Sequence, residues 1–443
     1  MPNSKKRLII RNGTLIDGTG APPVPNDAVV ISGGRIESVG PMPEDILLED
    51  PDNLQIIDAS GKTVMPGLID AHCHLSYGEP QSPEVNNRYT PAEYSALCAA
   101  WNAQKVLRAG VTSICVPGGS WFTDVAVRDS INAGMFEGPR IFCAGRLLSP
   151  YGAITDHEPV WGETPDSSTG VPVNTVHEMV AEVRRQCKAG VDLIKVADSQ
   201  SGDFQAISAE ELKAITDEAH RRNKKVTTHS RGQGAIKASI YAGVDWVLHA
   251  EYATEEDFYS LAQAGIGFMP TLTLQFNFID YAQDFGFSMR SRDAVRRLME
   301  RSARNLELAR QFGVKVMCGT DSGFTLTPYG EWHAYEPELL VRHGGFTPME
   351  AIVATTSNNA FAVGLEGQVG VIGPDKLADV LVLDGDPLQD ISVLQDHSKI
   401  SMVIKDGQPI DRDRPWPQRH LQSLERGGRE NPKVIHNPLV SVS

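Results

Sequence analysis

The chain has 443 residues, of which 41% are hydrophobic and 22% charged, an ordinary globular composition. Its formal net charge of −15 argues against a nucleic-acid partner, because the phosphates would repel it. No apolar run approaches the roughly 20 residues that cross a bilayer, so we do not expect a membrane protein.

The N-terminus and the cysteines indicate a cytoplasmic protein. Residues 1–7 are basic, but the apolar run after them is too short for a signal peptide. The six cysteines show no CxxC spacing and no regular framework. We therefore expect buried thiols in a reducing compartment rather than disulfides.

Both ends of the chain are predicted to be β-structure. Within residues 1–62, short β-branched runs alternate with turn signals such as Asn12-Gly13. The same pattern returns within residues 368–414, where two strand-like runs end in Asp-Gly turns. We predict that these two segments pair into one small composite β-sandwich domain.

The middle of the chain, residues 63–367, alternates strand and helix signals. A capping box at Ser208 and Glu211 begins one helix, and Thr347 begins another. Eight β/α units predict an α/β fold, a (β/α)8 TIM barrel. A doubly wound open sheet is the alternative, but no GxGxxG follows the first strand. The eight strand-like runs are 70–74, 110–116, 139–144, 191–196, 225–230, 244–251, 265–271 and 313–320.

The last segment, residues 415–443, is rich in Arg, Pro, Gly and Asn. Composition leaves two interpretations open, a disordered tail or an arm that docks on a neighbouring subunit of a homo-oligomer.

Two histidines end the first strand-like run. Because side chains alternate along a strand, His72 and His74 point to the same side and Cys73 points to the other. Two converging imidazoles are how a metal site begins, although such a pair can also be two half-exposed strand residues.

Further polar residues end later strands: Lys195, His229, His249 and Asp321. Each alone has a commoner role, since a strand-end histidine is usually structural and an aspartate before a helix is usually an N-cap. Six polar residues at the same end of five apolar strands are improbable by chance. Because chemistry in barrels collects at the C-terminal strand ends, we predict a metal site there.

Lys195 needs separate chemistry, because a protonated lysine repels a metal. Burial would lower its pKa, and the neutral amine can add carbon dioxide to form a carbamate. Such a group could bridge two divalent ions about 3.5–4 Å apart. Imidazole-rich ligation favours zinc, and cobalt, manganese or nickel would also fit.

With these residues in place, the chain resembles the amidohydrolase superfamily. The similarity is to its imidazolonepropionase-like and metal-dependent prolidase-like branch, which includes Xaa-Pro dipeptidases, carboxypeptidases and aryl-amide hydrolases. The resemblance rests on residues 11–18, 65–74, 189–195, 229, 242–249, 319–322 and 373–379.

The resemblance implies a role for each ligand. His72 and His74 would bind the more buried ion and His229 and His249 the other, with carboxylated Lys195 as the bridge. Asp321 would hold the first ion and act as the proton shuttle for a metal-bridging hydroxide.

The resulting hypothesis is a binuclear hydrolase of a C–N bond in a small amide, dipeptide-like, carbamate or urea substrate. Two alternatives stay open: a cyclic-amide hydrolase like imidazolonepropionase, and a non-catalytic amidohydrolase-like scaffold.

Three residues are candidates for substrate contact. Arg231 follows His229 by two and should face the same side, where it could clamp a carboxylate or stabilise an oxyanion; the alternative is a surface salt bridge. His157 lies in the long loop after the third strand. His333 lies in the loop after the eighth, where it could either contact the substrate or support a metal ligand from behind.

Overall fold

The computed structural model describes residues 6–42, 46, 51–79, 90–156, 158–166, 168–199, 202–285, 288–413 and 434–440. Within these residues, no helix is long and apolar enough to cross a bilayer. The described cysteines are free thiols, as the sequence predicts.

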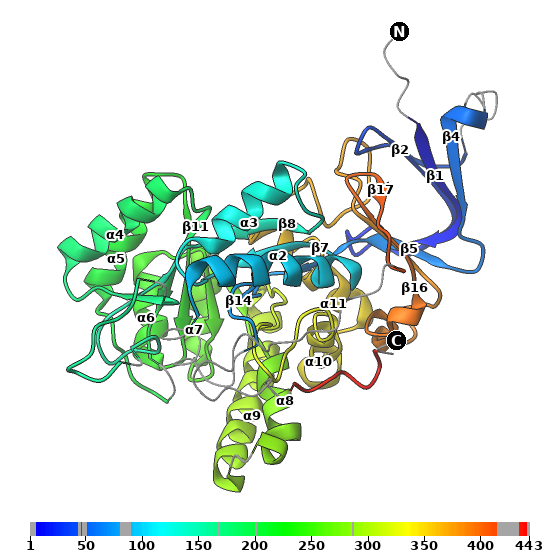
Figure 1. Cartoon of the computed structure of the whole chain (residues 1–443). Coiled ribbons are helices and arrows are strands. Elements are labelled where there is room, and N and C mark those ends of the chain that lie inside the picture. Colours follow the sequence, from blue (N-terminus) through cyan, green and yellow to red (C-terminus); the bar gives the residue numbers. More distant parts are fainter. Residues whose placement is uncertain are drawn as a thin grey trace.

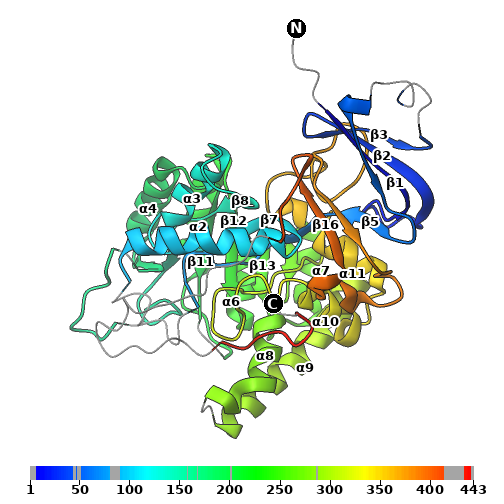
Figure 2. The ribbon, with the colours of Figure 1, turned by 45° about the vertical axis from the view of Figure 1, so that its right-hand side comes forward.

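Strands from both chain ends form one eight-stranded sheet at one end of the molecule. In Figures 1 and 2 the blue N-terminal and orange C-terminal strands lie side by side. Strand β5 joins the two halves, running parallel to β1 and antiparallel to β15. Ile10, Val64 and Val382 share one buried cluster in it. The strands are β1 (Arg7–Leu15), β2 (Val24–Ser32), β3 (Arg35–Gly40), β4 (Leu54–Asp58), β5 (Thr63–Pro66), β15 (Val380–Leu383), β16 (Ile400–Lys405) and β17 (Gln408–Pro409).

The chain ends therefore do pair with each other, but in a single sheet. The second layer of the predicted β-sandwich is not seen among the described residues. The boundaries of the three predicted segments, at residues 62/63, 367/368 and 414/415, stay predictions.

The middle of the chain forms parallel strands that alternate with helices. One sheet has the order β6-β7-β8, and the other has the order β10-β9-β11-β12-β13-β14. Strands β9 and β10, which frame the long loop after β8, were not predicted from the sequence. The strands are β6 (Leu68–Asp70), β7 (Val111–Val116), β8 (Arg140–Cys143), β9 (Leu147–Ser149), β10 (Gly170–Pro172), β11 (Leu193–Ala197), β12 (Lys225–Ser230), β13 (Trp246–His249) and β14 (Gly267–Met269).

The predicted eighth strand, 313–320, is not a regular strand. Its backbone still bonds on both sides, from Met317 N to Phe268 O (2.9 Å) and from Ala71 N to Cys318 O (3.0 Å). The side chain of Asn359 accepts from Cys318 N (3.0 Å) and donates to Cys318 O (2.7 Å). A side chain thus occupies positions that a neighbouring strand would otherwise fill, so the prediction of a regular strand is wrong.

Helices pack around these strands, as Figure 2 shows for α2, α3 and α4. The predicted capping boxes at Ser208 and Thr347 are confirmed at the starts of α5 and α11. The helices are α2 (Ala92–Arg108), α3 (Thr123–Asn132), α4 (Val176–Ala189), α5 (Ala209–His220), α6 (Gln233–Ala242), α7 (Glu255–Ala264), α8 (Thr273–Tyr281), α9 (Met289–Phe312), α10 (Tyr335–Gly344) and α11 (Pro348–Thr355). The short 3-10 helices are η2 (Pro51–Asn53), η3 (Ala282–Phe285), η4 (Asn359–Phe361), η5 (Ile391–Leu394) and η6 (His397–Lys399).

Residues 434–440 of the predicted tail pack on their own chain (red in Figure 1). Trp332 Nε1 donates to Ile435 O (2.9 Å), and Ile435 N donates to Thr325 O (3.0 Å). This part of the tail therefore covers the loop between the eighth run and α10.

Candidate metal centre

The first two predicted ligands converge. His72 and His74 follow β6, are both buried, and bring their Nε2 atoms within 3.1 Å of each other. His74 Nδ1 faces the carbonyl oxygen of Gly118 (2.7 Å), which accepts only from a protonated nitrogen. The proton is thus on Nδ1, and the lone pair of His74 Nε2 points into the site.

Asp321 completes a three-ligand group. Its Oδ1 lies 3.0 Å from His74 Nε2 and 3.4 Å from His72 Nε2, and the three residues form a group able to hold an ion. Two nitrogens bound to one tetrahedral zinc lie about 3.3 Å apart, so the 3.1 Å separation of the Nε2 atoms fits one ion.

The protonation states agree with this use. Burial lowers the pKa of His72 well below its ordinary value, which leaves the neutral imidazole that binds metals. The pKa of Asp321 lies below its ordinary value although burial opposes this, so the carboxyl is ionised.

A second histidine pair lies beside the first. His229 is the second-to-last residue of β12, and His249 is the last residue of the neighbouring strand β13. Their ring centroids are 4.3 Å apart. The ring of His249 lies 5.9 Å from that of His72. Both nitrogens of the buried His249 lack a hydrogen-bond partner. Buried polar groups nearly always have one, so His249 is arranged for a ligand.

Lys195, on β11, is buried and also lacks a partner. Its backbone pairs with Thr227 of the neighbouring strand β12, the residue is 1% exposed, and Nζ makes no hydrogen bond. Burial lowers the pKa of Lys195 to about 7. A large share of the amine is therefore neutral near pH 7, the form that carbamate formation requires.

The backbone is strained at the same strand ends. His249, Thr271 and Asp321 have φ values of 71°, 57° and 58°, a region that residues other than glycine rarely adopt. Each such residue costs about 1–3 kcal/mol and persists only where the surroundings enforce it. Two of these three strained residues, His249 and Asp321, are predicted metal ligands.

Arg231 reaches the site, but it already has partners. Its Nη1 forms a buried ion pair with Glu251, and its Nε donates to His229 Nε2 (3.2 Å). The expectation of a surface salt bridge is therefore wrong, because both partners are buried. A second ion on His229 Nε2 would require the contact with Arg231 to break.

The other two substrate candidates are His333 and His157. His333 is buried, and its Nδ1 and Nε2 contact Asp70 (2.7 Å) and Gly330 N (3.1 Å). Neither ring nitrogen is left for a substrate, so His333 takes the other position considered for it, behind the metal ligands. His157 lies outside the described residues.

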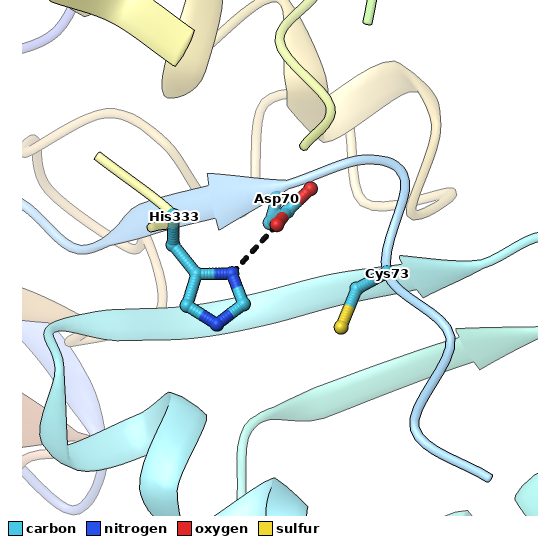
Figure 3. Close-up of side chains that lie close together, drawn as sticks. All are labelled: Asp70, Cys73 and His333. Atoms are coloured by element: carbon cyan, nitrogen blue, oxygen red, sulfur yellow. Dashed lines mark hydrogen bonds and ion pairs between the residues drawn. The ribbon is translucent and has the colours of Figure 1, made fainter. Parts of the chain in front are cut away.

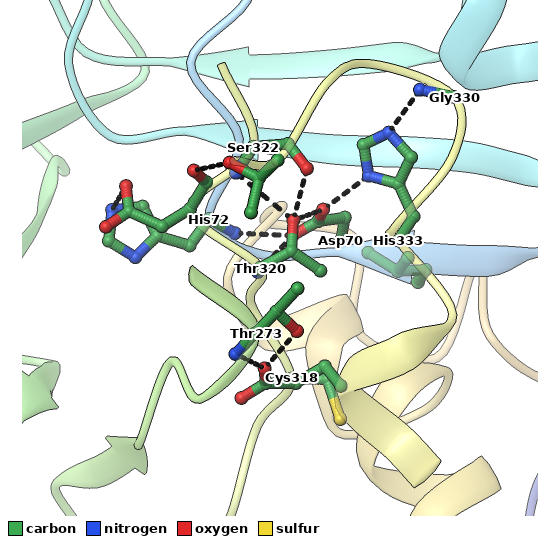
Figure 4. Close-up of polar contacts among 12 residues, drawn as sticks. Asp70, His72, Thr273, Cys318, Thr320, Ser322, Gly330 and His333 are labelled. Carbon is green, nitrogen blue, oxygen red and sulfur yellow. Dashed lines mark hydrogen bonds and ion pairs between the residues drawn. The ribbon is translucent and has the colours of Figure 1, made fainter. Parts of the chain in front are cut away.

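Sequence reasoning missed the groups that support the ligands, shown with their contacts in Figure 4. Asp70 accepts from His72 N (3.0 Å) and from Thr320 Oγ1 (2.5 Å). Thr271 Oγ1 lies 3.2 Å from His72 Nδ1. The one available signal was Asp70 itself, a carboxylate within an otherwise apolar strand.

Comparison with known proteins identifies relatives over nearly the whole chain. Residues 63–410 match the family model described as Amidohydrolase family. Ochratoxinase of Aspergillus niger is 30% identical, over 91% of this chain and 86% of the relative. Imidazolonepropionase of Symbiobacterium thermophilum is 25% identical, over 91% and 96%. The crystal structure of a prolidase complexed with N-methylphosphonate-L-proline superposes with a TM-score of 0.81, at 27% identity over 91% and 99% of the two chains. These neighbours imply an α/β fold of the TIM-barrel type.

Proposed function

Because the chain belongs to the amidohydrolase family and is a hydrolase of carbon–nitrogen bonds, we propose that it uses two divalent ions to hydrolyse a small amide-type substrate. The substrate class comprises linear amides, dipeptide-like molecules, carbamates and ureas. Zinc is the metal that the imidazole-rich donor set favours. The cytoplasmic location and the homo-oligomer stay predictions.

The observation that carries the proposal is the set of buried donors without protein partners. The Nε2 atoms of His72 and His74 face each other, and Nζ of Lys195 and both nitrogens of His249 have no hydrogen bond. Leaving a buried polar group unpaired costs about 1–3 kcal/mol. A fold that accepts this cost several times over in one place is built to receive a ligand there.

Each residue of the site has a role in this proposal. His72, His74 and Asp321 would hold one ion, and His229 and His249 would hold the other. When bound, such ions lower the pKa of water and polarise a carbonyl oxygen. Lys195, as the carbamate, would supply an oxygen to each ion.

Asp321 moves the proton. Its side chain is 12% exposed, and its Oδ1 lies 3.0 Å from His74 Nε2. It accepts the proton of the attacking water and returns it to the leaving nitrogen of the substrate. The shuttle needs an ionised resting state, which the lowered pKa of Asp321 provides.

Arg231 is the group we assign to the substrate. The ion pair with Glu251 holds the guanidinium at the site, and its remaining N–H groups can donate to a carboxylate or to a developing oxyanion. Arg231→Met should therefore lower kcat/KM while the metal content per chain stays the same.

Metal analysis and a substrate panel test the proposal together. We expect two tightly bound transition-metal ions per chain, with both metal content and turnover reduced in Lys195→Ala. Fewer than one ion per chain, together with activity unaffected by Lys195→Ala, would overturn the proposal.

The substrate panel separates linear from cyclic amides. Cyclic amides are included because the chain is 25% identical to an imidazolonepropionase. Turnover of linear amides, carbamates or ureas without ring opening supports the proposal, whereas turnover of cyclic amides alone would replace it with the cyclic-amide alternative.

A further inference from the structure

A second cluster of metal-binding residue types lies next to the proposed site. Asp70, Cys73 and His333 bring one donor atom each within 4.8 Å of one another, and Figure 3 shows His333 pointing at Asp70. By residue type alone, this trio would be a third metal site.

The hydrogen bonds of Asp70 argue against a metal there. Oδ1 accepts from His72 N (3.0 Å) and Thr320 N (3.2 Å). Oδ2 accepts from Thr320 Oγ1 (2.5 Å) and His333 Nδ1 (2.7 Å). A carboxylate has about four lone-pair positions, and protein donors occupy all four. The cluster is therefore a closed hydrogen-bond network.

The network ties together two chain segments that carry metal ligands. Asp70 holds the main chain of His72 on one side and of Thr320, the residue before Asp321, on the other (Figure 4). Asp321 N also donates to His72 O (2.8 Å), so the two segments are bonded at successive points. Asp321 has its strained positive φ at this junction.

His333 contributes in one defined protonation state. Gly330 N–H donates to His333 Nε2, so this nitrogen carries no proton. The proton of the neutral ring is then on Nδ1, which donates to Asp70 Oδ2. Both residues are buried, at 5% and 3% exposure, so water does not readily replace either bond.

We propose that Asp70 and His333 are positioning residues, which hold His72 and Asp321 at the separation that binds the ion. His333 acts through Asp70, and Asp70 acts through the main chain of both ligand segments. The inference rests on the proposed function, because it gives these residues their purpose.

Two variants of His333 test the proposal, and Zn²⁺ affinity of the metal-free protein, measured in competition with a chromophoric chelator, is the readout. His333→Leu removes the donor to Asp70, and we expect about 10- to 100-fold weaker Zn²⁺ binding. His333→Asn places an amide N–H where Nδ1 lies, and should restore most of that affinity. A purely structural role would not separate the two variants in Zn²⁺ affinity at equal thermal stability of the metal-free proteins.

A threonine pair keeps the test valid if His333→Leu does not fold. Thr320→Val removes one hydroxyl donor to Asp70. The control, Thr216→Val, removes an equally buried hydroxyl in α5 that donates to Leu212 O (3.0 Å). We expect Thr320→Val to weaken Zn²⁺ binding several-fold and Thr216→Val to leave it unchanged.

The outcomes separate this inference from the proposed function. A wild-type protein that binds Zn²⁺ and hydrolyses amides, with Zn²⁺ affinity within twofold of wild type in both His333→Leu and Thr320→Val, overturns only the positioning role. A wild-type protein that binds no transition metal overturns the proposed function, and this inference with it.

Discussion

Two polar regions of this molecule are built in opposite ways. Where β8 meets the chain-end sheet, Arg140 donates to both oxygens of Asp379 (3.0 and 3.1 Å) and also pairs with Asp406. At the strand ends, Lys195 Nζ and both nitrogens of His249 have no partner at all. The charge of Arg140 is thus paired where two parts of the structure join. At the proposed metal site, by contrast, buried nitrogens have no protein partner.

The largest expected effect is on turnover, and it tests whether the residues at the strand ends are catalytic. Asp321→Asn cannot accept a proton, so we expect kcat/KM for an amide substrate to fall by about 10²- to 10⁴-fold. Circular dichroism should show an unchanged fold. The control is Asp217→Asn, an exposed carboxylate on α5, which should keep wild-type turnover; an active Asp321→Asn would contradict the proton shuttle.

Metal removal should destabilise the protein through the same region. An ion present at a thousand times its Kd stabilises the folded state by about 4 kcal/mol. Chelation should lower the free energy of unfolding by an amount of this order, measured by urea denaturation with and without added Zn²⁺. Lys195→Met should show a smaller difference, and equal curves for wild type in both conditions would speak against a resident ion.

A matched pair of methionine substitutions compares the two regions directly in the metal-free protein. Arg140→Met leaves Asp379 buried without its cation, which should lower the free energy of unfolding by about 3 kcal/mol. Lys195→Met removes an unpartnered buried amine, so stability should be unchanged or higher. Metal content should fall only in Lys195→Met; a larger loss of stability there than in Arg140→Met would reverse the comparison.

The smallest expected effect is a pH dependence of the paired region. Burial raises the pKa of Asp406, but Lys405 and Arg140 lower it further, so it lies below the ordinary value of 3.8. A lowered carboxyl pKa stabilises the fold above the unfolded-state value, and this contribution is lost as pH falls through the folded-state value.

Asp406→Asn should thus be less stable than wild type at pH 7, by under about 1 kcal/mol because Asp406 is partly exposed. The difference between the urea midpoints of the two proteins should shrink as the pH falls below 3.8. A difference that grows on acidification would contradict the assignment.

Local patterns in the sequence predicted many elements because their causes are local. The capping boxes at Ser208 and Thr347 depend on residues three apart, and both form. The eighth strand failed for the opposite reason. Its ladder positions are taken by the side chain of Asn359, which no pattern within 313–320 reveals.

The site divides in the same way. His72 and His74 were predicted to converge from strand periodicity, and they do. Asp70 and Glu251 were missed, because their partners come from other strands and loops. The sequence left His333 either at the substrate or behind the ligands, and a 2.7 Å contact with Asp70 places it behind them.

The sequence by itself determined which donor types end the strands and that both chain ends form β-structure, because side-chain alternation and turn chemistry act over a few residues. Only the tertiary structure decided that Asp321 lies beside the pair His72 and His74, and that Lys195 has no hydrogen-bond partner. It also decided that Arg231 pairs with Glu251. Those facts depend on distances between segments far apart in the chain, which the packing of all the intervening elements sets.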